Sequence, residues 1–469
     1  MRLQKFMSLL LSCIMLCLSF QANCLSIYAE ALSAAEPTTD SDGTQAWNKS
    51  LGTDAYPQFS GKAVSYISEQ GEEVYSNTNI SCNNHSYVNG ICKTCGEYEV
   101  PTLENGAYQL SNYGELVWFQ QYVDADNTGA NAVLTADITA NKNLLNKDGS
   151  VSDVPVYKWT PIGRDLKLYY TGTFDGNGHI ISGLYSYYTD VYCGLFAKMK
   201  GTIKNLGIVD SYFGSEKCYH AASFAGYAAE GSVIENCFSD SSVVGYAYCG
   251  GIAGETYGKI SNCYYIGKIT ADSTDSNAIS SDKYNYGALE NCYYLESCGL
   301  STTRAVGKTA EQFASGDVCY ILKSSENNLV WGQNLSSEGS MPVLTSDEEL
   351  RVYRVTTVKD DASSSYYSNS SCTLPADDTG YWIDENGKVL YSPAKITKDT
   401  TITFKQFVSV LGDVNQNGKV EKADAAAVLR HVSGISLISD EAELLLADVN
   451  RDGNVDVRDA VEIIKKAAA

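Results

Sequence analysis

One short acidic pattern occurs twice near the end of the chain, in residues 413–424 and again in residues 448–459. In each copy, oxygen-bearing side chains stand at positions 1, 3, 5 and 12, and a glycine stands at position 6. Glycine tolerates the backbone conformations of a sharp bend, so Gly418 and Gly453 allow the chain to wind back on itself. Each segment is therefore predicted to form a loop that gathers oxygen atoms around one point.

This spacing is that of the calcium loop of an EF-hand, because Ca²⁺ prefers about six to eight oxygen ligands. Position 7 would offer its backbone carbonyl, and position 9 would act directly or through water. A pair of ordinary acidic turns is the alternative, but two copies in one segment favour the metal. The sequence predicts two calcium ions, held by Asp413, Asn415, Asn417, Lys419, Glu421 and Asp424 and by Asp448, Asn450, Asp452, Asn454, Asp456 and Asp459.

An apolar helix followed by a basic residue is predicted after each loop. No long amphipathic helix precedes the first loop, so the segment is not a pair of complete helix–loop–helix EF-hands. Two halves of loop plus helix, joined by a linker and with Asp at position 12, resemble a type I dockerin module over residues 411–469. The helical positions are Ala425, Val428, Leu429 and Arg430 in the first half and Ala460, Ile463, Ile464 and Lys465 in the second.

The dockerin resemblance implies a partner and a setting. Dockerins bind cohesin domains on a scaffold protein or cell surface, and cargo is thereby held in a cellulosome-like assembly that degrades plant polysaccharide. Loop positions 10 and 11 help to choose the partner, and these pairs differ between the two halves, which predicts one preferred docking orientation. The residues expected to contact cohesin are Lys422, Ala423, Arg430, Val457, Arg458 and Lys465.

Residues 1–31 are typical of a secretory signal peptide. Arg2 and Lys5 supply the positive end, and residues 6–20 form an apolar run that is short for a membrane span. The chain is therefore predicted to be secreted, extracellular and not membrane-spanning. Its net charge of −22 argues against nucleic acid and anionic membranes as partners.

A polar linker over residues 32–66 is predicted to lead into a small zinc knuckle over residues 67–100. Cys82 and His85, followed by Cys92 and Cys95, have the ligand spacing of one structural, tetrahedral zinc ion. Asn89 and Gly90 between the two pairs indicate a hairpin turn. The alternative is an ordinary disulfide beside one thiol and a surface histidine.

Repeats in residues 101–345 predict a right-handed parallel β-helix. Stacked coils of this fold would place matching residues about 4.8 Å apart. The matching asparagines would form a ladder of side-chain hydrogen bonds, and the cysteines after them would stack in the core. The asparagines are Asn205, Asn236, Asn262 and Asn291, and the cysteines are Cys237, Cys263 and Cys292.

A helix is predicted just before the repeats. Asn112 with Glu115 three residues later suggests an N-terminal capping box. Leu116, Phe119 and Val123 then fall on one face. Such a helix would cover the open end of the β structure.

The solenoid resembles the GLUG repeat modules of large bacterial surface proteins, over about residues 101–300. Residues 159–163 and 172–185 carry this resemblance. Such repeats occur beside IgA-cleaving metallopeptidases, which need a His-Glu-x-x-His helix. The chain has four histidines, His85, His179, His220 and His431, and none stands in that motif, so the peptidase activity is not carried over.

Catalysis by the solenoid is not expected from the sequence. Asp175 and His179 would make a carboxylate and a base in one loop, but the glycines between them favour a tight turn. Asp210 and Asp240 are predicted to be isolated, as is Asp190, and charged residues are not expected to line up from coil to coil. The abundant tyrosines would either stack on sugar rings or pack along the solenoid.

Residues 346–408 predict a small antiparallel β module with a hairpin at Asn386 and Gly387. The chain is thus expected to be mainly β, with a C-terminal α-helical dockerin over residues 409–469. Its predicted function is that of a secreted, non-catalytic component docked to cohesin, whose β-helix binds a plant polysaccharide or another surface protein. The alternative is a β-helix polysaccharide lyase or glycoside hydrolase in the same assembly.

Overall fold

The computed structural model describes residues 85–152, 157–164, 167, 169–188, 192–281, 286–322 and 331–468, together with five short strands before residue 85. Cys82, Asp190 and the predicted signal peptide lie outside the described residues. The chain divides into two compact units, Met1–Tyr98 and Glu99–Ala469. Within the described part, no helix has the length and apolar character needed to cross a lipid bilayer. Five short strands precede residue 85: β1 (Trp47–Asn48), β2 (Gln58–Phe59), β3 (Lys62–Ala63), β4 (Ser65–Ile67) and β5 (Glu73–Tyr75).

The described end of the first unit is a tight hairpin. Strands β6 (Tyr87–Val88) and β7 (Ile91–Cys92) pair antiparallel. Asn89 and Gly90 connect them with φ angles of 48° and 76°, as the sequence predicted for this turn. The hairpin carries three of the four residues predicted to bind zinc.

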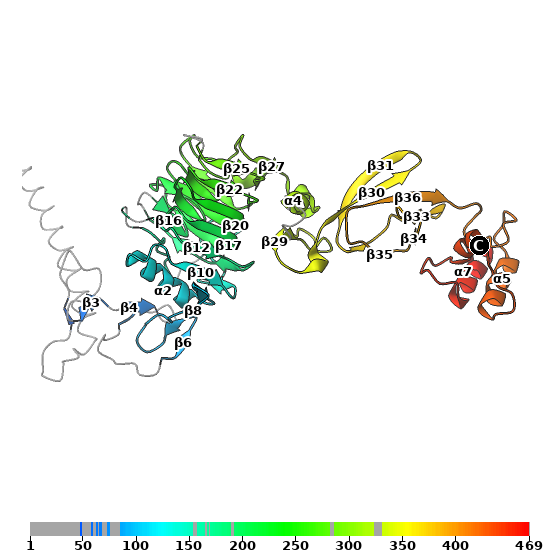
Figure 1. The fold of residues 1–469 in the computed structure, drawn as a ribbon, viewed down its shortest axis with the longest axis horizontal. Helices are drawn as coiled ribbons and strands as arrows, with labels where there is room; N and C mark the ends of the chain where they lie inside the picture. Colours follow the sequence, from blue (N-terminus) through cyan, green and yellow to red (C-terminus); the bar gives the residue numbers. More distant parts are fainter. Residues whose placement is uncertain are drawn as a thin grey trace, which may run out of the picture. The chain divides into compact units, whose positions relative to one another are not determined.

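A parallel β-solenoid begins the second unit, as the repeats predicted (Figure 1). Matching residues of successive repeats pair in register, such as Ile203 with Ile234 and Ile234 with Ile260. The edge strand β8 (Thr102–Glu104) alone pairs antiparallel in this 15-stranded sheet of the described chain. Along the main path lie β9 (Ala107–Leu110), β10 (Asn131–Leu134), β12 (Thr173–Asp175), β17 (Thr202–Gly214), β20 (Val233–Gly245), β23 (Tyr264–Tyr265), β26 (Tyr293–Leu295) and β27 (Val306–Lys308).

Shorter strands complete the coils. The sheet of β16 (Phe196–Met199), β19 (Ala225–Ala228) and β21 (Ala253–Thr256) forms another face of the solenoid, and β15 (Tyr192–Cys193) pairs with β18 (His220–Ala221). The remaining elements are β11 (Ile138–Thr139), β13 (Ile180–Ser182), β14 (Tyr185–Ser186), β22 (Lys259–Ser261), β24 (Lys268–Ala271), β25 (Ala288–Glu290) and η1 (Glu296–Cys298).

The predicted asparagine ladder is confirmed. The side-chain amide of each asparagine donates to the one before it, at 3.1 Å from Asn236 to Asn205, 3.2 Å from Asn262 to Asn236 and 2.8 Å from Asn291 to Asn262. All four have φ between 50° and 53°, a left-handed conformation that asparagine tolerates better than most residues. The ladder therefore explains why asparagine recurs at this position of each coil: its amide bonds to the next coil, and its backbone tolerates the bend.

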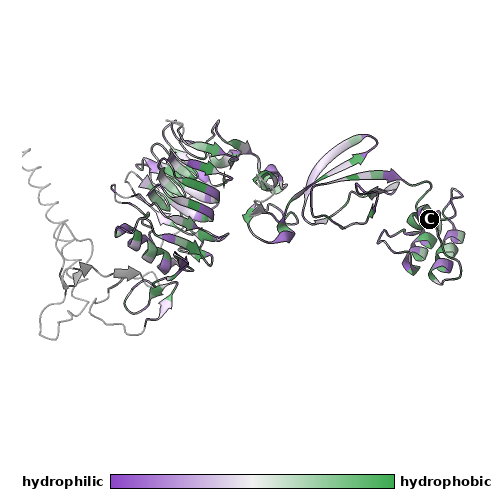
Figure 2. Ribbon diagram, in the orientation of Figure 1, coloured by the Kyte–Doolittle hydropathy of each residue, from purple (hydrophilic) through white to green (hydrophobic). Residues whose placement is uncertain are grey.

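The core of the solenoid is apolar and closely stacked. Cys237 and Cys263 are fully buried, and Cys292 is 3% exposed, as predicted for small core side chains. Hydrophobic residues recur along the stacked strands (Figure 2). Burial of this kind is the main source of stability for a sheet that repeats along one axis.

Helix α2 (Tyr113–Asp124) covers the N-terminal end of the solenoid. Its N-cap Asn112 accepts the backbone N–H of Glu115 at 3.0 Å, as predicted. The Glu115 carboxylate accepts the N–H of Ser111, one residue before the expected partner. Phe119 is fully buried and packs on Phe174 of the first coils, at 6.0 Å between ring centroids.

A second apolar cluster packs on the outward face of the main sheet. Tyr264 is fully buried there, and its ring lies 5.6 Å from that of Trp331. The Tyr264 hydroxyl donates to the carbonyl of Pro342 at 2.5 Å. The covering elements are α3 (Ala310–Ala314), α4 (Asp317–Leu322), β28 (Trp331–Gly332), β29 (Val343–Leu344) and η2 (Glu348–Leu350).

A five-stranded sheet follows, and it differs from the purely antiparallel sheet that was predicted. Strands β30 (Tyr353–Lys359) and β36 (Thr400–Gln406) run parallel, because a long connection carries the chain back before β36 begins. The predicted hairpin joins β33 (Gly380–Ile383) to β34 (Val389–Leu390), with Gly387 at φ 81°. The other strands here are β31 (Ala362–Ser368), β32 (Ser371–Cys372) and β35 (Ala394–Lys395).

The C-terminal region contains three helices, of which two were predicted. Helices α5 (Lys422–Val432) and α7 (Val457–Ala468) follow the two loops. Helix α6 (Glu441–Ala447) was missed, although Asp440 caps it by accepting the backbone N–H groups of Ala442 and Glu443. Val428 and Ile463 from α5 and α7 are fully buried in one small core.

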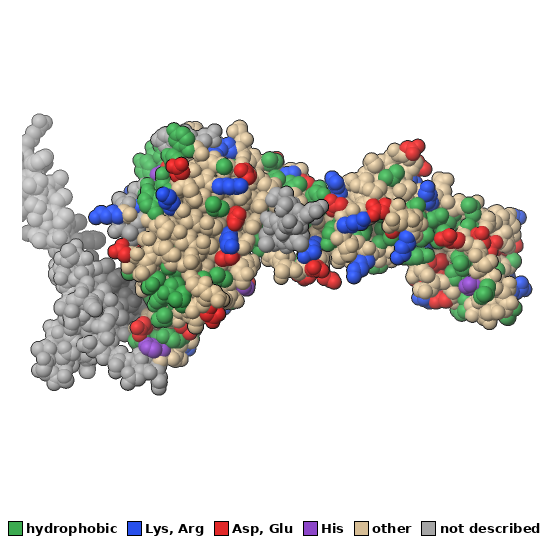
Figure 3. All heavy atoms as spheres, in the orientation of Figure 1, with side chains coloured by type: hydrophobic (Ala, Val, Ile, Leu, Met, Phe, Trp, Pro, Cys, Tyr) green, Lys and Arg blue, Asp and Glu red, His purple; other side chains and the backbone are tan. Residues whose placement is uncertain are grey.

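The expectation that charges do not line up between coils is wrong. Asp175 pairs in register with Lys204, and Lys204 pairs in register with Glu235. This alignment arises because β12, β17 and β20 are neighbouring parallel strands, so that residues at the same position of successive coils lie side by side. Lys204 and Asp175 form an ion pair at 3.2 Å. Acidic and basic side chains are interleaved on the face of the solenoid seen in Figure 3.

Candidate functional site

The first acidic loop is organised by its first and last aspartates. The Asp413 carboxylate accepts the backbone N–H groups of Asn417 at 3.1 Å and Gly418 at 2.7 Å. At the other end, Asp424 accepts the N–H of Asn415 at 3.1 Å and that of Glu421 at 2.9 Å. These bonds draw the two ends of the loop together around its side-chain oxygens.

The second loop repeats this pattern residue for residue. Asp448 accepts the N–H groups of Asp452 at 3.1 Å and Gly453 at 3.0 Å. Asp459 accepts those of Asn450 at 3.1 Å and Asp456 at 2.8 Å. The glycines at position 6 have the same φ, 85° for both Gly418 and Gly453, as the sharp bend requires.

Four carboxylates are buried in these loops. Asp413, Asp424 and Asp459 are 0% exposed, and Asp448 is 4% exposed. Among the ion pairs of the described residues, none joins these four to a basic side chain. Burial raises the pKa of Asp448, and the negative charges of Asp459 and Asp452 raise it further. Hydrogen bonds from the backbone N–H groups of Gly453 and Asp452 lower this pKa but do not cancel the rise. Buried acids of this kind need a cation or a proton.

Position 9 differs between the loops. In the first, Glu421 accepts the side-chain amide of Asn417 at 3.1 Å. In the second, the Arg458 guanidinium donates to Asp456 and also lies 2.6 Å from Asp452. Hydrogen bonds from Arg458 lower the pKa of Asp456. A positive charge therefore stands beside two of the predicted ligands of the second loop and none in the first.

The residues expected to contact a partner all lie on the surface. Lys422, Ala423, Arg430, Val457, Arg458 and Lys465 are exposed. Helix α7 also shows an apolar stripe, in which Val457, Val461 and Ile464 are 52%, 44% and 44% exposed. The same positions of α5 hold Lys422, Ala426 and Leu429. The two halves thus present unequal surfaces, and α7 has the more apolar one.

His85, Cys92 and Cys95 come together in the hairpin of the first unit. One ligand atom from each lies within 4.8 Å of the others. Burial raises the pKa of the Cys92 thiol, but backbone N–H groups of Cys95 and Thr94, with His85, outweigh this and lower it to about 5. The fourth predicted ligand, Cys82, lies outside the described residues.

One face of the solenoid carries a row of contacting aromatic rings, here named the tyrosine face. Centroids of Tyr227 and Tyr257 are 5.5 Å apart, and those of Tyr257 and Tyr286 are 5.4 Å apart. Tyr286 is 69% exposed and Tyr169 is 38% exposed at the two ends. The face consists of Tyr169, Tyr192, Tyr227, Tyr257 and Tyr286. By contrast, Tyr264, Tyr265, Tyr293 and Tyr294 are buried packing residues.

Charged groups lie beneath the tyrosine face, where the sequence did not place them. Lys198 and Glu255 both pair in register with Tyr227, one from each neighbouring coil. Lys198 is 2% exposed, and its ammonium lies 4.8 Å from the ring centre of Tyr169. His220 lies between the rings of Tyr192 and Tyr248, with Nδ1 3.5 Å from Glu255. Burial lowers the pKa of His220 to about 4, so its ring is neutral at pH 7.

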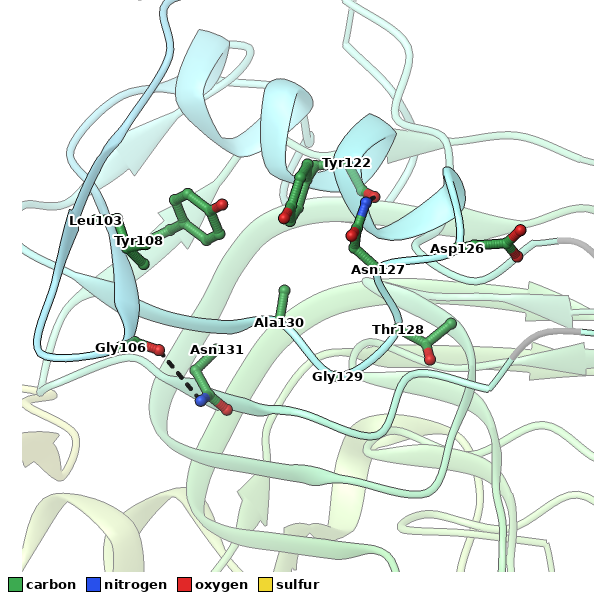
Figure 4. A pocket seen from close by; sticks show the side chains of 10 residues that line it. All are labelled: Leu103, Gly106, Tyr108, Tyr122, Asp126, Asn127, Thr128, Gly129, Ala130 and Asn131. Atoms are coloured by element: carbon green, nitrogen blue, oxygen red, sulfur yellow. Dashed lines mark hydrogen bonds between the residues drawn. The ribbon is translucent and has the colours of Figure 1, made fainter.

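A small pocket lies between β8, β9, the end of α2 and the loop after it. Its volume is 370 Å³, and Figure 4 shows Tyr108 and Tyr122 facing the same space. The hydrogen bond with Tyr122, together with burial, raises the pKa of Tyr108 to about 12. Asn127 and Asn131 donate to the carbonyls of Tyr122 and Gly106. Aromatic rings beside amides suit a small, neutral, polar ligand.

The other acidic candidates of the solenoid have structural partners. Asn177 donates its N–H to Asp175 at 2.9 Å and has a φ of 50°, which supports the turn. His179 lies 3.1 Å from Asp137, so it does not pair with Asp175. Asp210, expected to be isolated, accepts the N–H groups of Leu144 and Leu145. Asp240 pairs in register with Val209, the residue before Asp210, so these two acids are neighbours because their coils stack.

Comparison with known proteins agrees with the geometry of the C-terminal loops. Residues 411–466 match the family model of the dockerin type I domain. Type I dockerins bind calcium and dock to cohesin domains. No curated protein matches the chain. The crystal structure of a "putative immunoglobulin A1 protease" from Bacteroides ovatus is similar at a TM-score of 0.36 and 18% identity, covering 54% of this chain and 96% of that one.

Proposed function

We propose that this chain is an extracellular component that docks to a cohesin domain through residues 411–466, in a calcium-dependent manner. The observation that carries the proposal is the matching set of backbone hydrogen bonds to the first and last aspartates of the two loops, all four of which are buried. The solenoid and the sheet before the loops are then the cargo of a cellulosome-like assembly or of a cell surface.

The calcium part of the proposal rests on charge. Each loop brings buried carboxylates together, and like charges at short range repel one another. A divalent cation removes that repulsion and is coordinated by the oxygens at positions 1, 3, 5 and 12. Asp413 and Asp448 at position 1 each bind one of the two ions, and the backbone carbonyls of Lys419 and Asn454 at position 7 supply a further ligand to each.

Calcium titration into the full chain tests this part. We expect two ions per chain, and one ion after either Asp413→Ala or Asp448→Ala. The helical signal of α5 and α7 should rise on loading, because metal binding is coupled to folding of the loops. The control is Asp440→Ala, which removes the α6 cap but no predicted ligand. Equal helicity in chelator and in calcium would contradict the proposal.

Docking is proposed to use one orientation, with α7 against cohesin. The exposed stripe of Val457, Val461 and Ile464 offers apolar area, while Lys422 interrupts the matching stripe of α5. Apolar residues at the centre of an interface carry most of its affinity. Replacing Val457-Arg458 by Lys-Ala should weaken cohesin binding, and the reverse exchange at Lys422-Ala423 should change it little. Equal effects in both halves would argue for two orientations.

The solenoid is proposed to bind a plant polysaccharide through the tyrosine face. Its rings follow one another along the coils, and exposed aromatic rings can lie flat against sugar rings. Glycan-array binding by the full chain should weaken after Tyr257→Ala with Tyr286→Ala. Tyr187→Ala is the matched control, because Tyr187 is 54% exposed but lies outside this face. Equal binding by all variants would leave another surface protein as the partner.

A second candidate function is polysaccharide cleavage at the same face. The observation that favours it is the alignment of Lys198 and Glu255 on either side of Tyr227, with the buried His220 beside them. A base, an acid and an imidazole in one place are the components of general acid–base catalysis. Turnover of pectin, xylan or glucan that is lost in Lys198→Met would support this function.

A further inference from the structure

We propose that the hairpin of the first unit holds one zinc ion through His85, Cys92 and Cys95, and that Glu97 orients the histidine. This site is independent of the docking function. It rests on the described residues 85–98 only.

The three ligand atoms already lie close to a zinc geometry. The Cys95 sulfur is 3.5 Å from Nδ1 of His85, and all three ligand atoms lie within 4.8 Å of one another. Around a tetrahedral zinc ion, with Zn–S about 2.3 Å and Zn–N about 2.0 Å, neighbouring ligand atoms are about 3.3–3.8 Å apart. Only a small contraction is needed to close the site. Two thiolates and an imidazole favour zinc over calcium or magnesium.

The backbone holds the sulfurs in place. The N–H of Cys92 donates to the carbonyl of Glu97, and the N–H of Gly96 donates to the carbonyl of Cys92, both at 2.9 Å. This turn presents the N–H groups of Cys95 and Thr94 to the Cys92 sulfur. Gly96 has a φ of 71°, so a side chain there would strain the turn.

Glu97 supports the histidine from its other side. Nδ1 of His85 faces Cys95, while Nε2 lies 3.6 Å from Oε2 of Glu97. Histidines that bind metal commonly donate their second N–H to a carboxylate, which fixes the tautomer with a lone pair on the metal side. Tyr87 stacks on the imidazole at 5.5 Å with an angle of 12° between the rings. The same Oε2 atom lies 3.9 Å from the Cys95 sulfur, so the carboxylate stands beside both groups, and we assign it the role of a positioning residue for the histidine.

The hairpin also needs a crosslink. Of residues 85–98, only Gly90 and Cys92 are buried, so the described segment has almost no apolar core. Short segments without a core depend on metals or disulfides for stability. The disulfide alternative would join Cys92 and Cys95 and leave His85 without a role, yet His85 lies against both the sulfur and the carboxylate.

Metal analysis of the full chain tests the proposal. We expect one zinc per chain after purification under reducing conditions. Cobalt in its place should give thiolate-to-metal absorption bands, which vanish in Cys92→Ser, Cys95→Ser and His85→Asn. Because these residues lie in a separate compact unit, the solenoid should keep its circular dichroism in every variant. Less than a tenth of a zinc per chain, or a Cys92–Cys95 disulfide in peptide maps, would overturn the proposal.

The positioning role has its own measurement. Glu97→Ala should lower zinc affinity by about 10- to 100-fold in competition with a chromogenic chelator. Glu97→Gln should restore most of the affinity, because its amide oxygen can accept the histidine N–H once the site contracts around the metal. Glu104→Gln, on the exposed strand β8 of the second unit, is the matched control and should change nothing. Unchanged affinity in Glu97→Ala would contradict the role of Glu97.

Discussion

Arg458 donates two hydrogen bonds to the carboxylate of Asp456, at 2.9 Å from Nε and 2.7 Å from Nη2. The first loop has no such contact among its described residues, since Lys422 and Ala423 occupy the positions before Asp424. The two loops therefore have the same backbone hydrogen bonds but differ in local charge. Because Arg458 lies beside predicted calcium ligands and is also an expected cohesin contact, its removal should affect calcium binding and cohesin binding differently.

Removing Arg458 should strengthen calcium binding in the second loop. The guanidinium competes with the ion for Asp456 and Asp452, and it repels a divalent cation. Because Arg458 is exposed, the effect of Arg458→Ala is expected to be modest, about two- to five-fold. Calorimetric titration at low ionic strength measures it. Lys422→Ala is the matched control, and a fall in affinity for Arg458→Ala would contradict the prediction. The same variant should bind cohesin more weakly if Arg458 contacts the partner.

The asparagine ladder should contribute measurably to the stability of the solenoid. Asn236→Ala removes a partly buried donor and acceptor and also places alanine at a φ of 50°. We expect a loss of about 1–3 kcal/mol in local opening free energy. Hydrogen-exchange mass spectrometry of peptides from β17 and β20 measures this loss. Asn236→Gly keeps the backbone conformation accessible, so it should cost less, and equal protection in all three proteins would contradict the account.

The core cysteines of the solenoid should be unreactive. Burial raises the pKa of Cys249 to about 12, and burial also raises the pKa of Cys263. Only the thiolate reacts with alkylating reagents, so at pH 8 modification should require opening of the solenoid. Peptide mapping after iodoacetamide treatment tests this, with the unfolded chain as control. Rapid labelling of Cys249 in the native chain would contradict its burial.

Stability of the solenoid should fall between about pH 6.5 and pH 4. His220 has a folded pKa of about 4. The unfolded chain therefore binds a proton in this range that the folded chain does not, and stability rises with pH across it. The cost at low pH is about 1–3 kcal/mol, since Glu255 at 3.5 Å partly favours the proton. Thermal unfolding of His220→Phe should depend less on pH, and an equal slope would contradict the assignment.

The full chain is predicted to release no reducing sugar and no unsaturated product from pectin, xylan or glucan. Lys198 and Glu255 align, but Tyr227 stands between them in the stack of coils, since each of them pairs in register with it. Both charged side chains also lie beneath tyrosines, which separates them from a bound polysaccharide. Incubation at several pH values with product analysis tests this expectation. Turnover lost in Glu255→Gln would instead establish the enzymatic alternative.

Local sequence rules predicted much of the fold. The spacing of Asn205, Asn236 and Asn262 predicted the ladder, because each coil must bend at the same place. Gly418 and Gly453 likewise predicted the loops. These features depend on residues close in sequence or exactly repeated, and such signals are visible in the chain itself.

Features that depend on tertiary pairing were not predicted. Lys198, Tyr227 and Glu255 each follow a copy of one short repeat, but their residue types differ, so the register of β16, β19 and β21 was needed to show them side by side. The parallel pairing of β30 with β36 needs a connection whose path the sequence does not specify. Helix α6 is short, but Asp440 before a run of leucines was an available signal. The GLUG resemblance of the solenoid stays a prediction.

Binding of the full chain to cohesin domains from the same organism, in calcium and in chelator, tests the central claim most directly. The account predicts tight binding in calcium and its loss in chelator. Binding should weaken in Asp413→Ala and in Asp448→Ala, and disappear when both are combined. The Asp440→Ala control should bind like the unchanged chain. Binding of equal strength in chelator, or no binding to any of these cohesins in calcium, would contradict the proposed docking function.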